Sequence, residues 1–133
     1  MAALLATSGV RWEMRAGGKP LVKTEFELAP PGPGQAWVRV AGCGVCHTDL
    51  GFLYGGVQPR AGLPLTLGHE ISGVVVATAP GWERLVERAV IVPAVTPCGE
   101  CAACEAGHGT ICARQVMPGN DLPGGFASHV LVP

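Results

Sequence analysis

The chain has 133 residues, enough for one domain with its own core, and we expect residues 1–133 to form a single domain. It is 48% hydrophobic and 14% charged, its formal net charge is −1, and its nine lysines and arginines are scattered. This charge distribution argues against nucleic acid or anionic lipid as a partner and favours a small molecule.

The first eleven residues contain no positive segment before their short apolar run, so we do not expect a signal peptide. No apolar run approaches the roughly 18 residues of a membrane helix. We therefore expect a cytoplasmic protein that does not contact a membrane. Thiols stay reduced in that compartment, where clustered cysteines are more often metal ligands than disulfides.

Alternation of apolar and polar residues predicts strands at 19–28 and 36–41, separated by a P-P-G-P-G turn. The one convincing helical segment is 46–54, which ends at two glycines. A segment rich in β-branched residues predicts a further strand at 70–79. Shorter strand candidates are 88–92 and 126–132. The pattern predicts a mainly β fold.

Residues 98–112 contain four cysteines spaced C-x2-C-x2-C-x7-C, in the run C-G-E-C-A-A-C-E-A-G-H-G-T-I-C. Zinc takes four thiolates tetrahedrally in closed structural sites. An irregular stretch of this length needs something to hold it. We therefore expect a structural zinc in a lobe at about 95–120. Its ligands would be Cys98, Cys101, Cys104 and Cys112.

An iron–sulfur cluster is the main chemical alternative for these cysteines. A bacterial ferredoxin run begins in the same way, but its fourth cysteine comes sooner and is followed by proline, whereas Ala113 follows Cys112. From the residues alone, an iron–sulfur electron carrier and a non-enzymatic zinc-binding module remain alternatives to an enzyme.

A second set of candidate ligands is Cys46, His69 and Glu70, each beside the edge of a predicted strand. A catalytic zinc typically takes three protein ligands, including mixtures of cysteine and histidine, and leaves the fourth position open. Taken singly, His69 could equally be a core or loop histidine and Cys46 a buried apolar cysteine. Thr48 could be a helix N-cap.

Four motifs in sequence order resemble the N-terminal catalytic domain of the zinc-dependent medium-chain alcohol dehydrogenases. They are G-C-G-V-C-H-T-D-L, G-H-E-I-S-G-V-V, P-C-G-E-C-A-A-C-E-A-G-H-G-T-I-C and G-G-F-A-S-H-V. The resemblance covers most of the chain. It implies a GroES-like, partly open β-barrel with short helices and a four-cysteine zinc lobe. It also implies NAD-linked oxidation of a secondary alcohol to a ketone, in a homo-oligomer when full-length.

The resemblance also implies roles for individual residues. Cys46 and His69 match the family's catalytic zinc ligands, and Glu70 matches an alternative ligand. Asp49 matches the carboxylate that orients the ligating histidine, whose free ring N–H needs an acceptor.

Thr48 matches the hydroxyl that hydrogen-bonds the substrate alcohol and begins proton removal, and His47 matches a catalytic position that approaches the cofactor phosphates. Many relatives complete a proton relay with a histidine where this chain has Gly51, so the relay must end differently here or use water. The remaining candidates are expected outside the metal sites: Cys43 in the core, His108 in the lobe and His129 on a strand.

No complete G-x-G-x-x-G fingerprint is present, so we expect the family's Rossmann domain to be absent from this chain. The third catalytic zinc ligand is expected beyond Pro133. We therefore expect a fragment of a longer enzyme, inactive alone, whose NAD is bound mainly by the missing domain.

A narrower resemblance rests on D-L-G-F-L-Y and the tail Q-V-M-P-G-N-D-L-P-G-G-F-A-S-H-V-L-V-P. It is to the members of this family that oxidise 6-hydroxycyclohex-1-ene-1-carbonyl-CoA in anaerobic benzoyl-CoA degradation. This resemblance implies a hydroxyacyl-CoA substrate.

Overall fold

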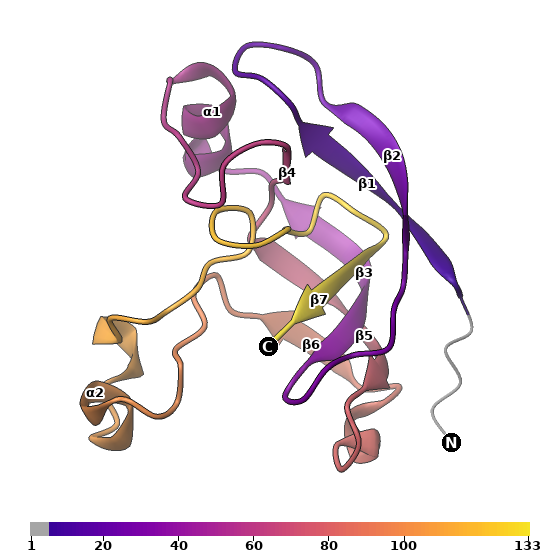
Figure 1. Ribbon diagram of the computed structural model, residues 1–133, viewed down its shortest axis with the longest axis vertical. Helices are drawn as coiled ribbons and strands as arrows, with labels where there is room; N and C mark the ends of the chain where they lie inside the picture. The colour runs from indigo at the N-terminus through magenta and orange to yellow at the C-terminus, as the bar shows by residue number, and fades with distance from the viewer. Residues whose placement is uncertain (1–5) are drawn as a thin grey trace.

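The computed structural model describes residues 6–133 and confirms the mainly β fold (Figure 1). One sheet has the order β2-β1-β4 and the other the order β6-β5-β3-β7, and the pairs within both are antiparallel. The strands are β1 (Ser8–Met14), β2 (Val22–Glu27), β3 (Ala36–Gly44), β4 (Leu65–Thr66), β5 (Glu70–Thr78), β6 (Ala89–Val92) and β7 (His129–Val132).

The five strands predicted from the sequence are all present as β2, β3, β5, β6 and β7, with changed bounds. The pattern did not predict β1, because a charged residue occupies one of its buried positions. Glu13 is only 6% exposed, and its carboxylate pairs with Arg11 at 2.9 Å and Arg15 at 3.3 Å. β4 has two residues, too few to show a period.

The core of the larger sheet follows the alternation of β5. Ile71, Val75 and Ala77 are buried, and the residues between them are more exposed. Successive side chains of a strand point to opposite faces, so these three lie on one face. Val38 and Val130 from the neighbouring strands pack with Ile71 and Val75 in one cluster. Burying each such side chain contributes roughly 1.5–3 kcal/mol.

A segment before β7 joins the two sheets. The N–H of Phe126 donates to the carbonyl of Leu67 at 2.9 Å, and the N–H of Trp12 donates to the carbonyl of Phe126 at 2.9 Å. Two residues on, the N–H of Val40 donates to Ser128 O at 2.9 Å. Residues 124–128 thus connect β1 and β4 to β3 and make the predicted partly open barrel.

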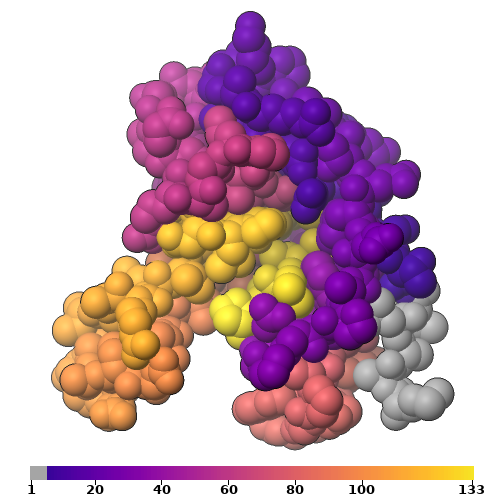
Figure 2. All heavy atoms as spheres, in the orientation of Figure 1, coloured from indigo at the N-terminus to yellow at the C-terminus, as the bar shows by residue number. Residues whose placement is uncertain are grey.

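The helix predicted at 46–54 is confirmed as α1 (His47–Tyr54). The remaining helices are single turns: η1 (Glu83–Leu85), α2 (Ala102–Glu105) and η2 (Gly109–Ile111). The last two lie inside the stretch predicted to be an irregular lobe, which projects from the barrel (Figure 2). Within residues 6–133, every helix is too short or too polar to span a lipid bilayer.

Candidate metal centres

The first candidate centre begins at the N-terminus of α1. Cys46 is the N-cap residue and has an extended backbone, and its N–H donates to Asp49 Oδ2 at 3.0 Å. This bond satisfies a backbone donor that the helix itself leaves unpaired. Thr48 is therefore not the N-cap, which was the structural alternative for this residue. The cap fixes the start of the helix and with it the position of the Cys46 side chain.

His69 reaches Cys46 because the chain turns at Gly68. Gly68 has φ +100°, and a Cβ there would lie 2.7 Å from Phe126 and 2.8 Å from Cys43 Sγ, so a larger residue does not fit. Beyond this turn His69 is buried, with Nε2 3.2 Å from Cys46 Sγ. Two zinc ligands at a tetrahedral angle, with ordinary Zn–S and Zn–N bonds, lie about 3.5 Å apart.

The Glu70 side chain occupies space that its partner on the neighbouring strand, a glycine, leaves open. It pairs with Gly44 in the register of β3 and β5, and a Cβ on Gly44 would collide with Glu70 Oε2. The candidate ligand atoms of Cys46, His69 and Glu70 all lie within 4.8 Å of one another, so this group could hold a metal ion. This role of Gly44 was not predicted from the sequence, although the glycine lies within the motif G-C-G-V-C.

Asp49 lies beside the Nδ1 atom of His69. Its side chain is fully buried, and Oδ1 is 3.7 Å from His69 Nδ1. Neither atom has a hydrogen-bond partner within residues 6–133. Leaving two such buried polar atoms unpaired is costly, and a small shift would pair them. The arrangement fits a histidine that binds a metal through Nε2 and donates its Nδ1–H to a carboxylate.

The other two predicted catalytic residues lie on the first turn of α1. His47 and Thr48 are both exposed and directly follow Cys46. A molecule bound at Cys46 would therefore be within reach of groups on this turn.

The second centre contains the four lobe cysteines. Their Sγ atoms are 3.5 Å apart for Cys101 and Cys104, 3.5 Å for Cys98 and Cys112, 3.7 Å for Cys101 and Cys112, and 3.9 Å for Cys98 and Cys104. Four thiolates placed tetrahedrally around zinc, at the usual Zn–S length, are about 3.8 Å apart. All four thiols are free. The group could therefore hold a metal ion.

The surroundings of these four sulfurs differ. Cys112 is buried, and its sulfur accepts the backbone N–H groups of Cys98 and Arg114 at 3.4 and 3.3 Å. A backbone hydrogen bond from Glu100 lowers the pKa of Cys98 to about 6, whereas burial raises the pKa of Cys104 to about 11. A bound metal would be needed to hold all four as thiolates.

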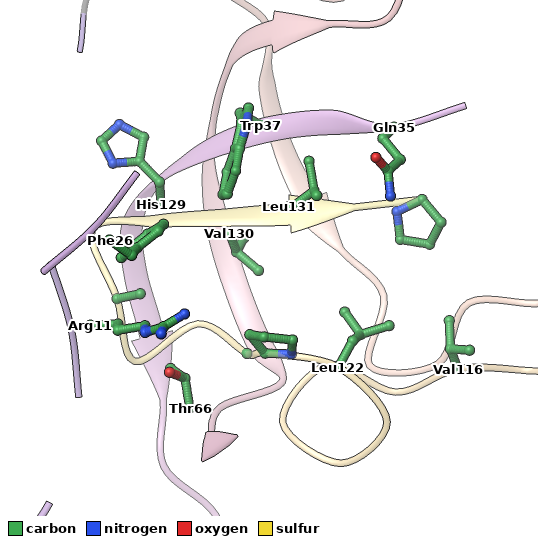
Figure 3. Close-up of a pocket in the computed structure, with 14 residues that line it drawn as sticks. Arg11, Phe26, Gln35, Trp37, Thr66, Val116, Leu122, His129, Val130 and Leu131 are labelled. Carbon is green, nitrogen blue, oxygen red and sulfur yellow. The ribbon is translucent and has the colours of Figure 1, made fainter. Parts of the chain in front are cut away.

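Three residues were expected outside the metal centres. Cys43 packs against the core cluster of β5, and burial raises the pKa of its thiol. His108 is exposed and precedes η2. His129 lies in β7 and lines a separate hollow of about 360 Å³ together with Trp37 and Thr66 (Figure 3). None of the seven candidate metal ligands lines this hollow.

Residues 32–133 match the family model described as the alcohol dehydrogenase GroES-like domain. The alcohol dehydrogenase of Geobacillus stearothermophilus is 38% identical over 113 residues, which are 84% of this chain and 34% of that protein. An S-(hydroxymethyl)glutathione dehydrogenase of Escherichia coli O1:K1 / APEC is 40% identical over 113 residues, 83% of this chain and 30% of that protein. The chain spans about a third of the length of these relatives.

Solved structures of dehydrogenases have the same fold. The cobalt- and zinc-bound thermostable alcohol dehydrogenase of Pyrobaculum aerophilum superposes with a TM-score of 0.84 at 28% identity, over 95% of this chain and 39% of that chain. A structure described as a short chain alcohol dehydrogenase of Escherichia coli CFT073, complexed with NADH, also gives a TM-score of 0.84 at 28% identity, over 96% of this chain and 37% of that chain. These relatives do not favour an iron–sulfur carrier or a non-enzymatic zinc module. The chain belongs to the GroES-like domain family of the zinc-dependent medium-chain alcohol dehydrogenases.

Proposed function

We propose that this chain is the catalytic-domain portion of a zinc-dependent, NAD-linked dehydrogenase that oxidises a secondary alcohol to a ketone. One observation carries the proposal: Cys46 Sγ lies 3.2 Å from His69 Nε2, and Glu70 completes a group of possible ligands within 4.8 Å. The names of the relatives, alcohol dehydrogenases and an S-(hydroxymethyl)glutathione dehydrogenase, support this reaction class.

Zinc bound by Cys46 and His69 would supply a Lewis acid that lowers the pKa of the substrate alcohol. Glu70 is the alternative ligand, and Asp49 fixes the ring of His69. The exposed hydroxyl of Thr48 hydrogen-bonds the substrate oxygen and begins removal of its proton.

The proton's onward path and the cofactor involve two neighbouring positions. Gly51 has no imidazole to continue a relay, so the proton passes from Thr48 to water. His47, exposed beside Cys46, acts in catalysis by approaching the phosphates of NAD. NAD, when bound, would supply the acceptor for the hydride of the alcohol carbon.

We assign the other metal a structural role. Cys98, Cys101, Cys104 and Cys112 supply four ligands and leave no open position, so zinc there would hold the lobe at about 95–120 in shape without taking part in the reaction.

We further propose that residues 1–133 form one domain of a longer, homo-oligomeric cytoplasmic enzyme. The matched relatives are about three times as long, which supports a separate NAD-binding domain and a third zinc ligand beyond Pro133. The chain alone would then not turn over substrate. The substrate we propose is 6-hydroxycyclohex-1-ene-1-carbonyl-CoA, a hydroxyacyl-CoA of anaerobic aromatic degradation. This choice rests on the two motifs in α1 and the tail.

Elemental analysis after purification without added metal tests the two metal sites. We expect one tightly bound zinc per chain and a second, weaker one. Cys46→Ala should lose only the weak zinc and keep the fold, and in the longer enzyme it should abolish NAD reduction by a secondary alcohol. Iron with inorganic sulfide, or no metal at all, would contradict the proposal. If the longer enzyme oxidises simple secondary alcohols but not the acyl-CoA, only the proposed identity of the substrate would be wrong.

A further inference from the structure

The loop of residues 55–64 connects the two parts of the Cys46–His69 centre. It follows α1, which begins after Cys46, and leads into β4, which is three residues before His69. Its sequence is G-G-V-Q-P-R-A-G-L-P, and Pro59 is its one buried residue. Because this loop buries little of itself, its path depends on the few polar contacts it makes.

Apart from backbone bonds to the end of α1 and within the loop itself, these contacts are with one turn, residues 117–122. The guanidinium of Arg60 makes a two-pronged contact with Asp121, with Nε 2.7 Å from Oδ1 and Nη2 2.7 Å from Oδ2. The N–H of Arg60 donates to Asn120 Oδ1 at 2.9 Å, and the N–H of Ala61 donates to Asn120 O at 2.8 Å. Exposed ion pairs usually contribute little, but a forked pair supported by neighbouring hydrogen bonds is the exception.

Asp121 also holds the turn itself together. The N–H of Met117 donates to Asp121 Oδ2 at 2.8 Å, and the Asp121 side chain is only 17% exposed. The turn packs closely against Gly68, the residue before His69. A Cβ on Gly119 would lie only 2.7 Å from the backbone nitrogen of Gly68.

The same turn follows the base of the four-cysteine lobe. The lobe closes where Thr96 and Val116 exchange two backbone hydrogen bonds, of 2.8 and 3.0 Å. The turn starts at the next residue. Residues 117–122 therefore contact the loop after α1, the segment before His69 and the lobe.

We propose that Arg60 and Asp121 form a clamp that positions the two segments carrying the metal ligands Cys46 and His69. The clamp works through the backbone, so both are positioning residues. As a statement about metal binding, the inference rests on the proposed function. As a statement about the loop, it stands on the contacts of Arg60.

Arg60→Met tests the clamp, because it removes the guanidinium and leaves the Asp121–Met117 bond in place. Asp121→Asn is the second variant, which keeps the size of the side chain and removes its charge. Arg15→Met is the matched control, because it removes another exposed arginine whose partner is Glu13 at 3.3 Å. Amide hydrogen exchange of residues 55–64 is the first measurement. We expect exchange about tenfold faster in Arg60→Met and no change in Arg15→Met.

The second measurement is a titration with Co²⁺ alone of protein whose lobe retains zinc, followed by the thiolate-to-cobalt absorption. We expect Arg60→Met and Asp121→Asn to weaken this binding about tenfold, the low end of the loss that follows removal of a group hydrogen-bonded to a metal ligand, because the clamp acts only through the backbone. Equal exchange rates in Arg60→Met and the unchanged protein would overturn the clamp. Faster exchange with the same cobalt affinity would overturn its positioning role. An unchanged protein that takes up no cobalt would overturn the proposed function, and the exchange rates would still decide the clamp.

Discussion

The carboxylate of Asp49 and the imidazole of His69 face each other inside the protein, with Oδ1 3.7 Å from Nδ1. On the other side of the ring, Nε2 is 3.2 Å from Cys46 Sγ. The second oxygen of Asp49 accepts the N–H of Cys46. One buried side chain thus fixes the backbone of one candidate ligand and faces the ring of the other.

Asp49→Asn is expected to separate these two tasks. The amide oxygen can still accept the N–H of Cys46, so α1 should stay capped. The negative charge that favours an N–H on His69 Nδ1 is lost, and affinity for zinc at the Cys46 centre should fall about 10- to 100-fold. Competition with a chelator measures this affinity. The same affinity in Asp49→Asn would contradict a role in orienting the histidine.

Gly44→Ala tests whether the place of Glu70 depends on the missing side chain at position 44. The added methyl would overlap Glu70 Oε2 and push the carboxylate away from Cys46 and His69. Binding of the weaker metal should drop about tenfold, a usual scale for disturbed support of a metal site. Gly42→Ala, on the same strand, is the matched control, because its Cβ would meet its nearest atom, Ser72 Oγ, at 3.8 Å. Equal metal affinities in the two variants would show that the space at Gly44 does not decide the position of Glu70.

Cys104→Ser is expected to release the metal of the lobe and destabilise the protein. Its Sγ lies 3.5 Å from Cys101 Sγ in the four-cysteine group, and structural zinc sites stabilise the folded state directly. Thermal unfolding and zinc content are the measurements. Cys43→Ala is the control, because Cys43 is a half-buried cysteine outside both groups of candidate ligands. This variant should retain the zinc of the lobe and lose only about 1 kcal/mol of unfolding free energy. Equal thermal stability of Cys104→Ser and the unchanged protein would refute a structural metal.

Gly68→Ala should destabilise the protein by about 3 kcal/mol or more, because a positive φ and close packing act together. Gly34→Ala separates the two causes. Gly34 has φ +73° with nothing within 4 Å of an added Cβ, so that variant should lose only about 1–2 kcal/mol. Denaturant unfolding measures both. If the free energy of unfolding falls no more in Gly68→Ala than in Gly34→Ala, the close packing against Phe126 does not contribute to the cost.

The two halves of the candidate site differ in how far the sequence predicts them. The lobe could be predicted in detail because its ligands lie within fifteen residues, and short spacings force their sulfurs together whatever the rest of the fold does. Cys46 and His69 are 23 positions apart, and only the resemblance to a family joined them before the structure did. Their 3.2 Å contact depends on the turn at Gly68 and the cap at Asp49.

The sequence by itself determined the β-rich class, the helix after Cys46 and the four-cysteine lobe, because periodicity, turn residues and ligand spacing act over short distances along the chain. Only the tertiary structure decided the buried pairing of Glu13 within β1, the room that Gly44 leaves for Glu70, and the contact of Arg60 with Asp121. Glu13 pairs with neighbours along its own strand, but its burial depends on how β1 packs in the fold. Gly44 and Glu70, like Arg60 and Asp121, lie far apart in the sequence, and they meet through strand register and loop packing, which the whole chain sets together.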